Sequence, residues 1–252
     1  MNANLSESVY SQLDLRHILR TIATLQSRIG ERFPGSGLEK VAAELYRIGE
    51  ETGPILERAA RPHWPLRAAV IVIAFGIVGL TAGLIWYFGS LSFDVDGVGD
   101  MLQALESAAQ DLIFFSVALY FLFTLESRLK RRVALRELHR LRSVVHIVDM
   151  HQLTKDPEHL LSPHLRTPSS PAQRFTRFEL ARYLDYCTEL LSLSSKLAAV
   201  HVQHLNDAVV LNAVNDVETL AANLSSKIWQ KIVILDTVVE RGEDLTELPV
   251  RS

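Results

Sequence analysis

The sequence predicts an all-α protein in which a two-span transmembrane helical hairpin carries a cytosolic helical bundle. Two apolar runs lie between residues 66 and 129, and a short acidic turn joins them. The flanking segments repeat apolar side chains at three- and four-residue steps, which is typical of amphipathic helices. No Pro or Gly occurs over 126–153, so the second span is expected to continue as a long cytosolic helix.

We expect six segments along the chain of 252 residues. They are an N-terminal helical hairpin (1–64), the transmembrane hairpin (65–127), the cytosolic extension of its second helix (128–154), a Pro-rich linker (155–173), a C-terminal helical hairpin (174–241) and a tail (242–252). Gly53-Pro54 is expected to kink or interrupt the second N-terminal helix. The N-terminal hairpin is short for a core of its own and is expected to pack on the C-terminal helices.

The amino-acid composition limits the classes of partner and the covalent cross-links that are expected for this chain. A formal charge of −3 argues against nucleic acid as the main partner, because phosphate binding needs clustered Lys and Arg. The single cysteine, Cys187, excludes an intramolecular disulfide and falls on an apolar stripe, where a buried thiol is expected. The N-terminus lacks the basic and apolar regions of a signal peptide, so the first apolar run is expected to stay as an anchor.

The first predicted span, over 66–89, includes about 22 consecutive residues without a charge, enough to cross a bilayer core of about 30 Å. Gly76, Gly79 and Gly83 share one face of this helix and predict close helix packing. The chain's own second span is the expected neighbour, although glycine is common in membrane helices without such a role.

The distribution of basic residues predicts the topology. No Lys or Arg occurs between Arg67 and Arg128, and Arg128, Lys130, Arg131 and Arg132 follow the hairpin. The positive-inside rule places both termini in the cytoplasm and the turn over 90–100 outside a cell membrane. The same four residues either act only as this topology signal or also contact anionic lipid head groups.

The second predicted span, over 101–125, has an apolar run of only about 14 residues and must include polar sequence to cross the bilayer core. The polar side chains form a stripe: Gln103, Glu106, Ser107, Gln110 and Asp111. Ile113, Val117 and Thr124 continue it toward the cytoplasm.

Three interpretations of this stripe remain open. Copies of the chain turn it toward a shared axis, where the carboxylates form acidic rings of a cation pathway. Alternatively, residues 101–110 form an amphipathic collar at the outer interface. In the third, the stripe hydrogen-bonds to the first span or to a partner protein.

A second stripe on the long helix carries His139, His146 and Asp149, a candidate pH-sensing or metal-binding set. On a continuous helix His146 and His151 lie about 140° apart and cannot share one ion, so only His146 with Asp149 is feasible. A solvated or interhelical role is favoured, and we expect no bound metal.

No nucleotide-binding, metalloprotease or nucleophile motif is present, so we expect neither an enzyme nor a cofactor. Two functions fit the pattern. The first is a homo-oligomeric, cation-conducting membrane assembly, which the second span lines and the cytosolic bundle gates or assembles. The alternative is a non-conducting, membrane-anchored scaffold or sensor that binds a cytosolic protein partner through the bundle.

Overall fold

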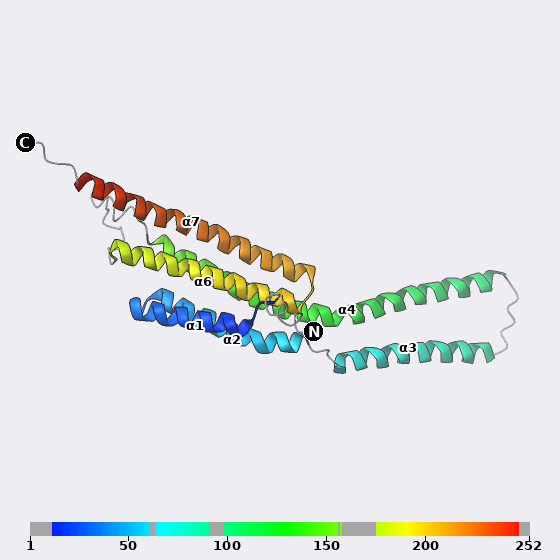
Figure 1. Cartoon of the computed structure of the whole chain (residues 1–252). Helices are drawn as coiled ribbons and strands as arrows, with labels where there is room; N and C mark the ends of the chain where they lie inside the picture. The colour runs from blue at the N-terminus through cyan, green and yellow to red at the C-terminus, as the bar shows by residue number, and fades with distance from the viewer. Residues whose placement is uncertain (1–11, 61–63, 91–97, 156, 158–174, 247–252) are drawn as a thin grey trace, which may run out of the picture. The chain divides into compact units, whose positions relative to one another are not determined.

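The computed structural model describes residues 12–60, 64–90, 98–155, 157 and 175–246. All regular structure among these residues is helical: α1 (Leu15–Arg32), α2 (Gly37–Ala60), α3 (Trp64–Ser90), α4 (Val98–Leu153), α6 (Arg177–His204) and α7 (Ala208–Thr246) (Figure 1). The predicted all-α class is therefore confirmed. The chain divides into a bundle unit, Met1–Ala60 with Val133–Ser252, and a hairpin unit, Arg61–Arg132.

The bundle unit contains α1, α2, α6, α7 and the C-terminal part of α4. α6 packs against α7, α1 and α2, and α1 also packs against α2. The expected packing of the N-terminal helices on the C-terminal pair is thus confirmed. All five helices supply side chains to one apolar core; these include Ile22, Ile29, Leu45, Ile48, Leu138, Leu141, Val148, Leu184, Leu191, Leu197, Val214 and Ile228.

The predicted break between the first two helices is confirmed, and local sequence explains it. Asp14 caps the start of α1 by accepting a hydrogen bond from the Arg16 backbone N–H at 2.9 Å. After α1, Gly35 adopts a φ of 71°, which favours glycine. The Ser36 hydroxyl then accepts the Glu39 backbone N–H at 3.2 Å and opens α2.

The two C-terminal helices also begin at capping residues. Thr176 and Glu179 form a capping box at the start of α6, in which each side chain accepts the other residue's backbone N–H. At the start of α7, the Asp207 carboxylate accepts the backbone N–H groups of Val209 and Val210. Asp207 is therefore the N-cap of α7.

Two helices extend beyond their predicted ends. α2 continues through Gly53-Pro54 to Ala60, so the predicted interruption is wrong, whereas the kink given as its alternative stays a prediction. Pro54 is exposed and removes only one backbone donor, while Leu56 beyond it is buried in the core and holds the last turns. α7 reaches Thr246, beyond the boundary predicted at 241. Most of the predicted linker (158–173), most of the outside turn (91–97) and the end of the tail (247–252) lie outside the described residues.

The hairpin unit contains α3 and the first part of α4, and the expected continuity of the second helix is confirmed because α4 is a single helix from Val98 to Leu153. In the described part of the chain, no helix has the length and apolar character required of a membrane span. The predicted spans over 66–89 and 101–125 are therefore not supported by this finding. In α4, the polar side chains between Gln103 and Gln110 interrupt the apolar sequence.

Candidate functional site

The polar stripe of α4 is exposed in the hairpin unit. Gln103, Glu106, Ser107 and Gln110 are all exposed, whereas the Asp111 side chain lies outside the described part. The half-buried side chains of this stretch, Phe115, Leu119 and Leu122, lie about 140–180° around the helix from Glu106. The stripe thus occupies the open side of α4. The interpretation in which it hydrogen-bonds to the first span gains no support from this placement.

The apolar continuation of the stripe shares its azimuth. Ile113 and Val117 are more than half exposed, on the same side as Glu106. Thr124 is half-buried, and its hydroxyl donates to the Tyr120 carbonyl oxygen at 3.0 Å. The open face of α4 therefore changes from polar to apolar along its length.

The glycine face of α3 is open as well. A Cβ added at Gly76, Gly79 or Gly83 would meet no atom within 4 Å in the described structure. The side of α3 that is least exposed carries Val70 and Ala74. The three glycines lie on the other side of the helix. Among the described residues, the prediction that the chain's own second span packs on these glycines is not supported, because larger apolar side chains occupy the covered side.

Both helices of the hairpin unit expose large apolar side chains. Phe75 is 74% exposed and Trp86 is 81% exposed on α3, and Phe114 and Tyr120 are exposed on α4. Apolar surface of this extent on a soluble monomer is unusual and marks a protein or membrane contact. The exposed positions lie on several sides of both helices.

The basic residues after the hairpin are partly engaged. Lys130 Nζ lies 2.9 Å from Glu126 Oε1, and the Arg128 guanidinium stacks over the Phe121 ring at 5.3 Å. Arg132 is exposed and Arg131 is half-buried. Arg128 and Arg132 therefore remain the most accessible of the four predicted head-group residues.

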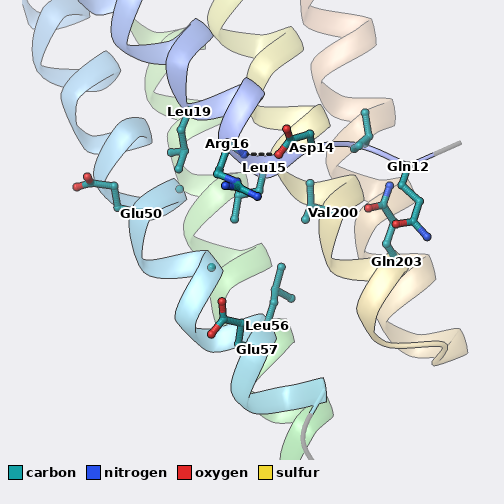
Figure 2. A pocket seen from close by; sticks show the side chains of 13 residues that line it. Gln12, Asp14, Leu15, Arg16, Leu19, Glu50, Leu56, Glu57, Val200 and Gln203 are labelled. Carbon is teal, nitrogen blue, oxygen red and sulfur yellow. Dashed lines mark hydrogen bonds between the residues drawn. The ribbon is translucent and has the colours of Figure 1, made fainter. Parts of the chain in front are cut away.

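A pocket of about 820 Å³ lies in the bundle unit, at the N-terminus of α1 (Figure 2). Its walls come from the start of α1, the C-terminal half of α2 and the end of α6. Leu15 of α1, Leu56 of α2 and Val200 of α6 contribute apolar side chains. Sequence periodicity provides no separate signal for this pocket, because its walls meet only through the packing of three helices.

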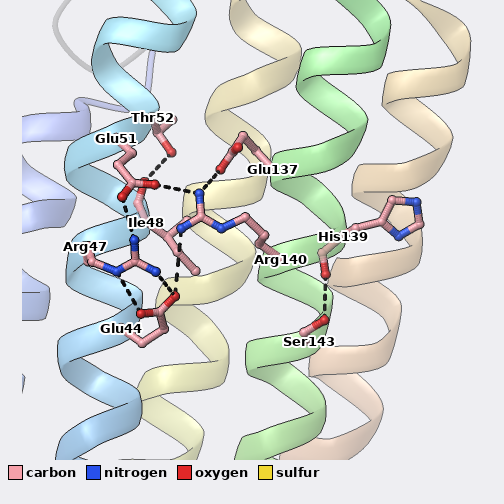
Figure 3. Close-up of polar contacts among 9 residues, drawn as sticks. All are labelled: Glu44, Arg47, Ile48, Glu51, Thr52, Glu137, His139, Arg140 and Ser143. Carbon is pink, nitrogen blue, oxygen red and sulfur yellow. Dashed lines mark hydrogen bonds and ion pairs between the residues drawn. The ribbon is translucent and has the colours of Figure 1, made fainter.

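A cluster of five charged residues, which we name the Arg140 cluster, joins α2 to α4 (Figure 3). Arg140 Nη1 lies 2.6 Å from Glu51 Oε2 and 2.7 Å from Glu137 Oε2. Arg47 lies 2.7 Å from Glu51 and 2.6 Å from Glu44, and Arg140 Nη2 lies 3.8 Å from the same Glu44 oxygen. The three carboxylates and two guanidinium groups leave one net negative charge.

Glu137 is the most buried residue of this cluster, so its carboxylate depends most on a paired cation. Its residue exposure is only 5%, and a buried carboxylate is costly without a paired cation. The hydrogen bond from Arg140 also lowers the pKa of Glu51. This cluster was not predicted from the sequence. Glu137 directly precedes Leu138 on the apolar face of α4, and that position was the available signal.

The predicted histidine stripe does not converge on a metal site. His139 and His146 are exposed, and Asp149 accepts a hydrogen bond from Gln152 Nε2 at 2.6 Å. Within the described residues, no three His, Cys, Asp or Glu side chains are placed to hold a metal ion. His151 is half-buried, and its burial lowers its pKa.

Two features of the C-terminal helices are explained by their neighbours. Lys231, which interrupts the apolar seam of α7, donates to the side-chain oxygen of buried Gln152 at 2.9 Å and so links α7 to α4. Cys187 is fully buried, and burial raises the pKa of its thiol to about 12. The expected buried thiol is confirmed, and an inert thiol follows from it.

Comparison with protein-family models, with curated proteins and with solved structures finds no match to this chain.

Proposed function

We propose that α3 and the first part of α4 insert into a bilayer and that copies of the chain assemble around α4, whose polar stripe lines a cation pathway. The exposed stripe on the open side of α4 is the observation that carries this proposal. Both termini lie in the cytoplasm of a cell in this arrangement, and the bundle unit assembles or gates the pathway.

Sequence and exposure support the insertion of α3. Residues 68–89 contain no charged side chain, and no Lys or Arg occurs from there to Arg128. Phe75 and Trp86 are exposed on different parts of this helix, where lipid would cover them. The finding that the described helices include no membrane span stands against insertion. Liposome flotation of the full chain tests this step directly.

The open stripe supports assembly. A charged side chain that faces lipid is costly, so ionisable side chains in membrane spans usually face a protein or water-filled interior. Glu106 lies on the open side of α4, away from the half-buried Phe115. A shared axis between copies provides Glu106 with such an interior without any contact to α3.

The test measures oligomeric state and cation flux with the same preparation. Full-length protein is reconstituted into liposomes, and flux is compared between the wild type, Glu106→Gln and the matched control Glu218→Gln on α7. We expect an oligomer, with cation selectivity reduced in Glu106→Gln and unchanged in Glu218→Gln. A monomer without flux contradicts the assembly. Flux with unchanged selectivity in Glu106→Gln contradicts only the role of the stripe.

A second candidate function is a non-conducting, membrane-anchored scaffold or sensor that binds a protein partner through the bundle unit. It is favoured by exposed apolar side chains there, because Trp229 of α7 is 63% exposed and Met150 of α4 is 67% exposed. Val233 and Ile234 are also exposed near Trp229. Affinity capture with the full chain should then recover a partner that Trp229→Glu loses and Glu218→Gln retains. No flux would accompany this result.

A further inference from the structure

The pocket at the N-terminus of α1 has a shape that depends on glycine. Gly49 and Gly53 of α2 line it without contributing side chains. At Gly49, an added Cβ would lie 2.6 Å from Leu19 Cδ2, so α2 and the Leu19 side chain are already close there. At Gly53, an added Cβ would reach only ordinary contact, 3.4 Å from Leu15 Cδ2. The volume of about 820 Å³ falls in the range of sites for drug-sized ligands.

The inner wall of the pocket is apolar. Leu56 and Val200 are buried, and Leu15 and Leu19 are half-buried, so four aliphatic side chains from three helices face the space. Figure 2 shows Leu15 of α1 and Leu56 of α2 directed into the gap between their helices, with Val200 of α6 at one side. A ligand with an apolar body would remove this surface from water, at about 25 cal/mol per Å² of apolar area.

The charged side chains at the rim of the pocket determine which charge the ligand should carry. Asp14 and Glu57 contribute carboxylates and Arg16 contributes one guanidinium group, whereas the Glu50 side chain, which is hydrogen-bonded to Tyr46, points away from the gap between α1 and α2 (Figure 2). The Asp14 carboxylate also accepts the Arg16 backbone N–H at 2.9 Å (Figure 2). The side chains at the rim therefore carry a net charge of about −1 at neutral pH. This charge disfavours an anionic ligand and favours a cation.

We propose that this pocket binds a small organic cation with an apolar body, such as an arylalkylamine. The aliphatic wall covers the apolar body, and the ammonium group lies near the carboxylates at the rim. The site belongs to the bundle unit, so it does not depend on membrane insertion or on cation flux through the hairpin unit.

The test uses isothermal titration of the full chain with three probes. 2-(1-Naphthyl)ethylamine has an apolar aromatic group and a positive charge. 1-Naphthylacetate has the same aromatic group with a negative charge, and ethylamine has the positive charge without the aromatic group. We expect saturable binding of the naphthylethylamine. The other two probes should bind at least about tenfold more weakly, a difference of about 1.4 kcal/mol. Equal binding of the naphthylacetate, or absence of saturable naphthylethylamine binding, overturns the proposal.

Substitutions distinguish binding of the probe in the pocket from its unspecific adsorption to the protein. Glu57→Lys removes a rim carboxylate at an exposed position, and Gly53→Leu places a side chain in the space. Each should weaken naphthylethylamine binding at least about tenfold. Glu31→Lys makes the same charge change on the exposed far part of α1 and should leave the affinity within about twofold. Circular dichroism verifies that the variants fold. Unchanged affinity in a folded Glu57→Lys protein contradicts the site, and so does an equal loss in Glu31→Lys.

Discussion

Arg140 pairs with carboxylates on two helices, α2 and α4. It is the only described cation within 4 Å of the Glu137 carboxylate, and it also pairs with Glu51 of α2. Arg140→Met leaves the Glu137 carboxylate buried without its cation. We expect the free energy of unfolding to fall by about 2 kcal/mol, between the values for exposed and fully buried pairs. Denaturant unfolding of the full chain, followed by circular dichroism, measures the change.

Arg47→Met is the matched control for this prediction. Arg47 belongs to the same cluster, but its side chain is 56% exposed and its two partners are partly exposed as well. Exposed pairs contribute little to stability because water solvates both partners after the pair is broken. Equal losses in the two variants would contradict the special role of the buried Glu137 carboxylate.

Gly37 shows a different kind of constraint at the residue scale. A Cβ added there would lie 2.7 Å from Nε2 and 3.0 Å from Nδ1 of the His151 ring, so the ring must move. We expect Gly37→Ala to destabilise the protein by about 1 kcal/mol, at the low end for overpacking because His151 is only half-buried. Gly76→Ala is the control. Its Cβ would meet no atom within 4 Å, so improved helix propensity should leave stability unchanged or raise it. Thermal unfolding that ranks these two variants in the opposite order would contradict this account.

At the element scale, the C-terminal end of α4 should confer a pH dependence on stability. Burial, with a smaller contribution from Lys155, holds the folded-state pKa of His151 below its unfolded value of about 6.5. The unfolded chain then binds the proton more tightly, so stability falls as the pH drops below about 6.5. The lowered pKa values of Glu51 and Glu179 act in a separate window, below about 4.5.

His151→Gln should reduce the loss of folding stability between about pH 7.5 and pH 5, because it removes the imidazole group. His139→Gln should retain the loss, because His139 is exposed on the same helix. The melting temperature of each variant across this range supplies the measurement. A pH dependence that is the same in the wild type and in His151→Gln would contradict the assignment.

Helix positions follow from the sequence more closely than helix contacts do. Apolar spacing predicts the helical hairpins that form α1 with α2 and α6 with α7. The continuation through Pro54 escaped prediction because the burial of Leu56, a tertiary effect, outweighs one missing hydrogen bond. The same limit applies to Glu137 and to the pocket of α1. Both depend on which faces of separate helices meet, and one helix's periodicity does not specify its neighbour.

At the scale of the whole molecule, the contacts between α2 and α4 define how the bundle unit closes. Gly37 lies against His151, and Glu51 pairs with Arg140, so the two helices run antiparallel. From the Glu51–Arg140 contact, Ala60 lies about 13 Å farther along α2. Val133 lies about 11 Å back along α4, toward the same end. The ends to which residues 61–132 are joined are therefore neighbours.

This geometry predicts that the hairpin unit can be replaced without unfolding the bundle unit. Packed helices lie about 8–10 Å apart, and about eight Gly and Ser residues span roughly 16 Å. A chain in which such a linker replaces residues 61–132 should keep its helical circular dichroism and unfold cooperatively, because the described residues of that segment contribute nothing to the apolar core. The full chain should float with zwitterionic liposomes and the shortened chain should not, because only the full chain has the exposed apolar side chains of α3. If neither chain floats, bilayer insertion of the hairpin unit is contradicted, and with it both the cation pathway and a membrane-anchored scaffold.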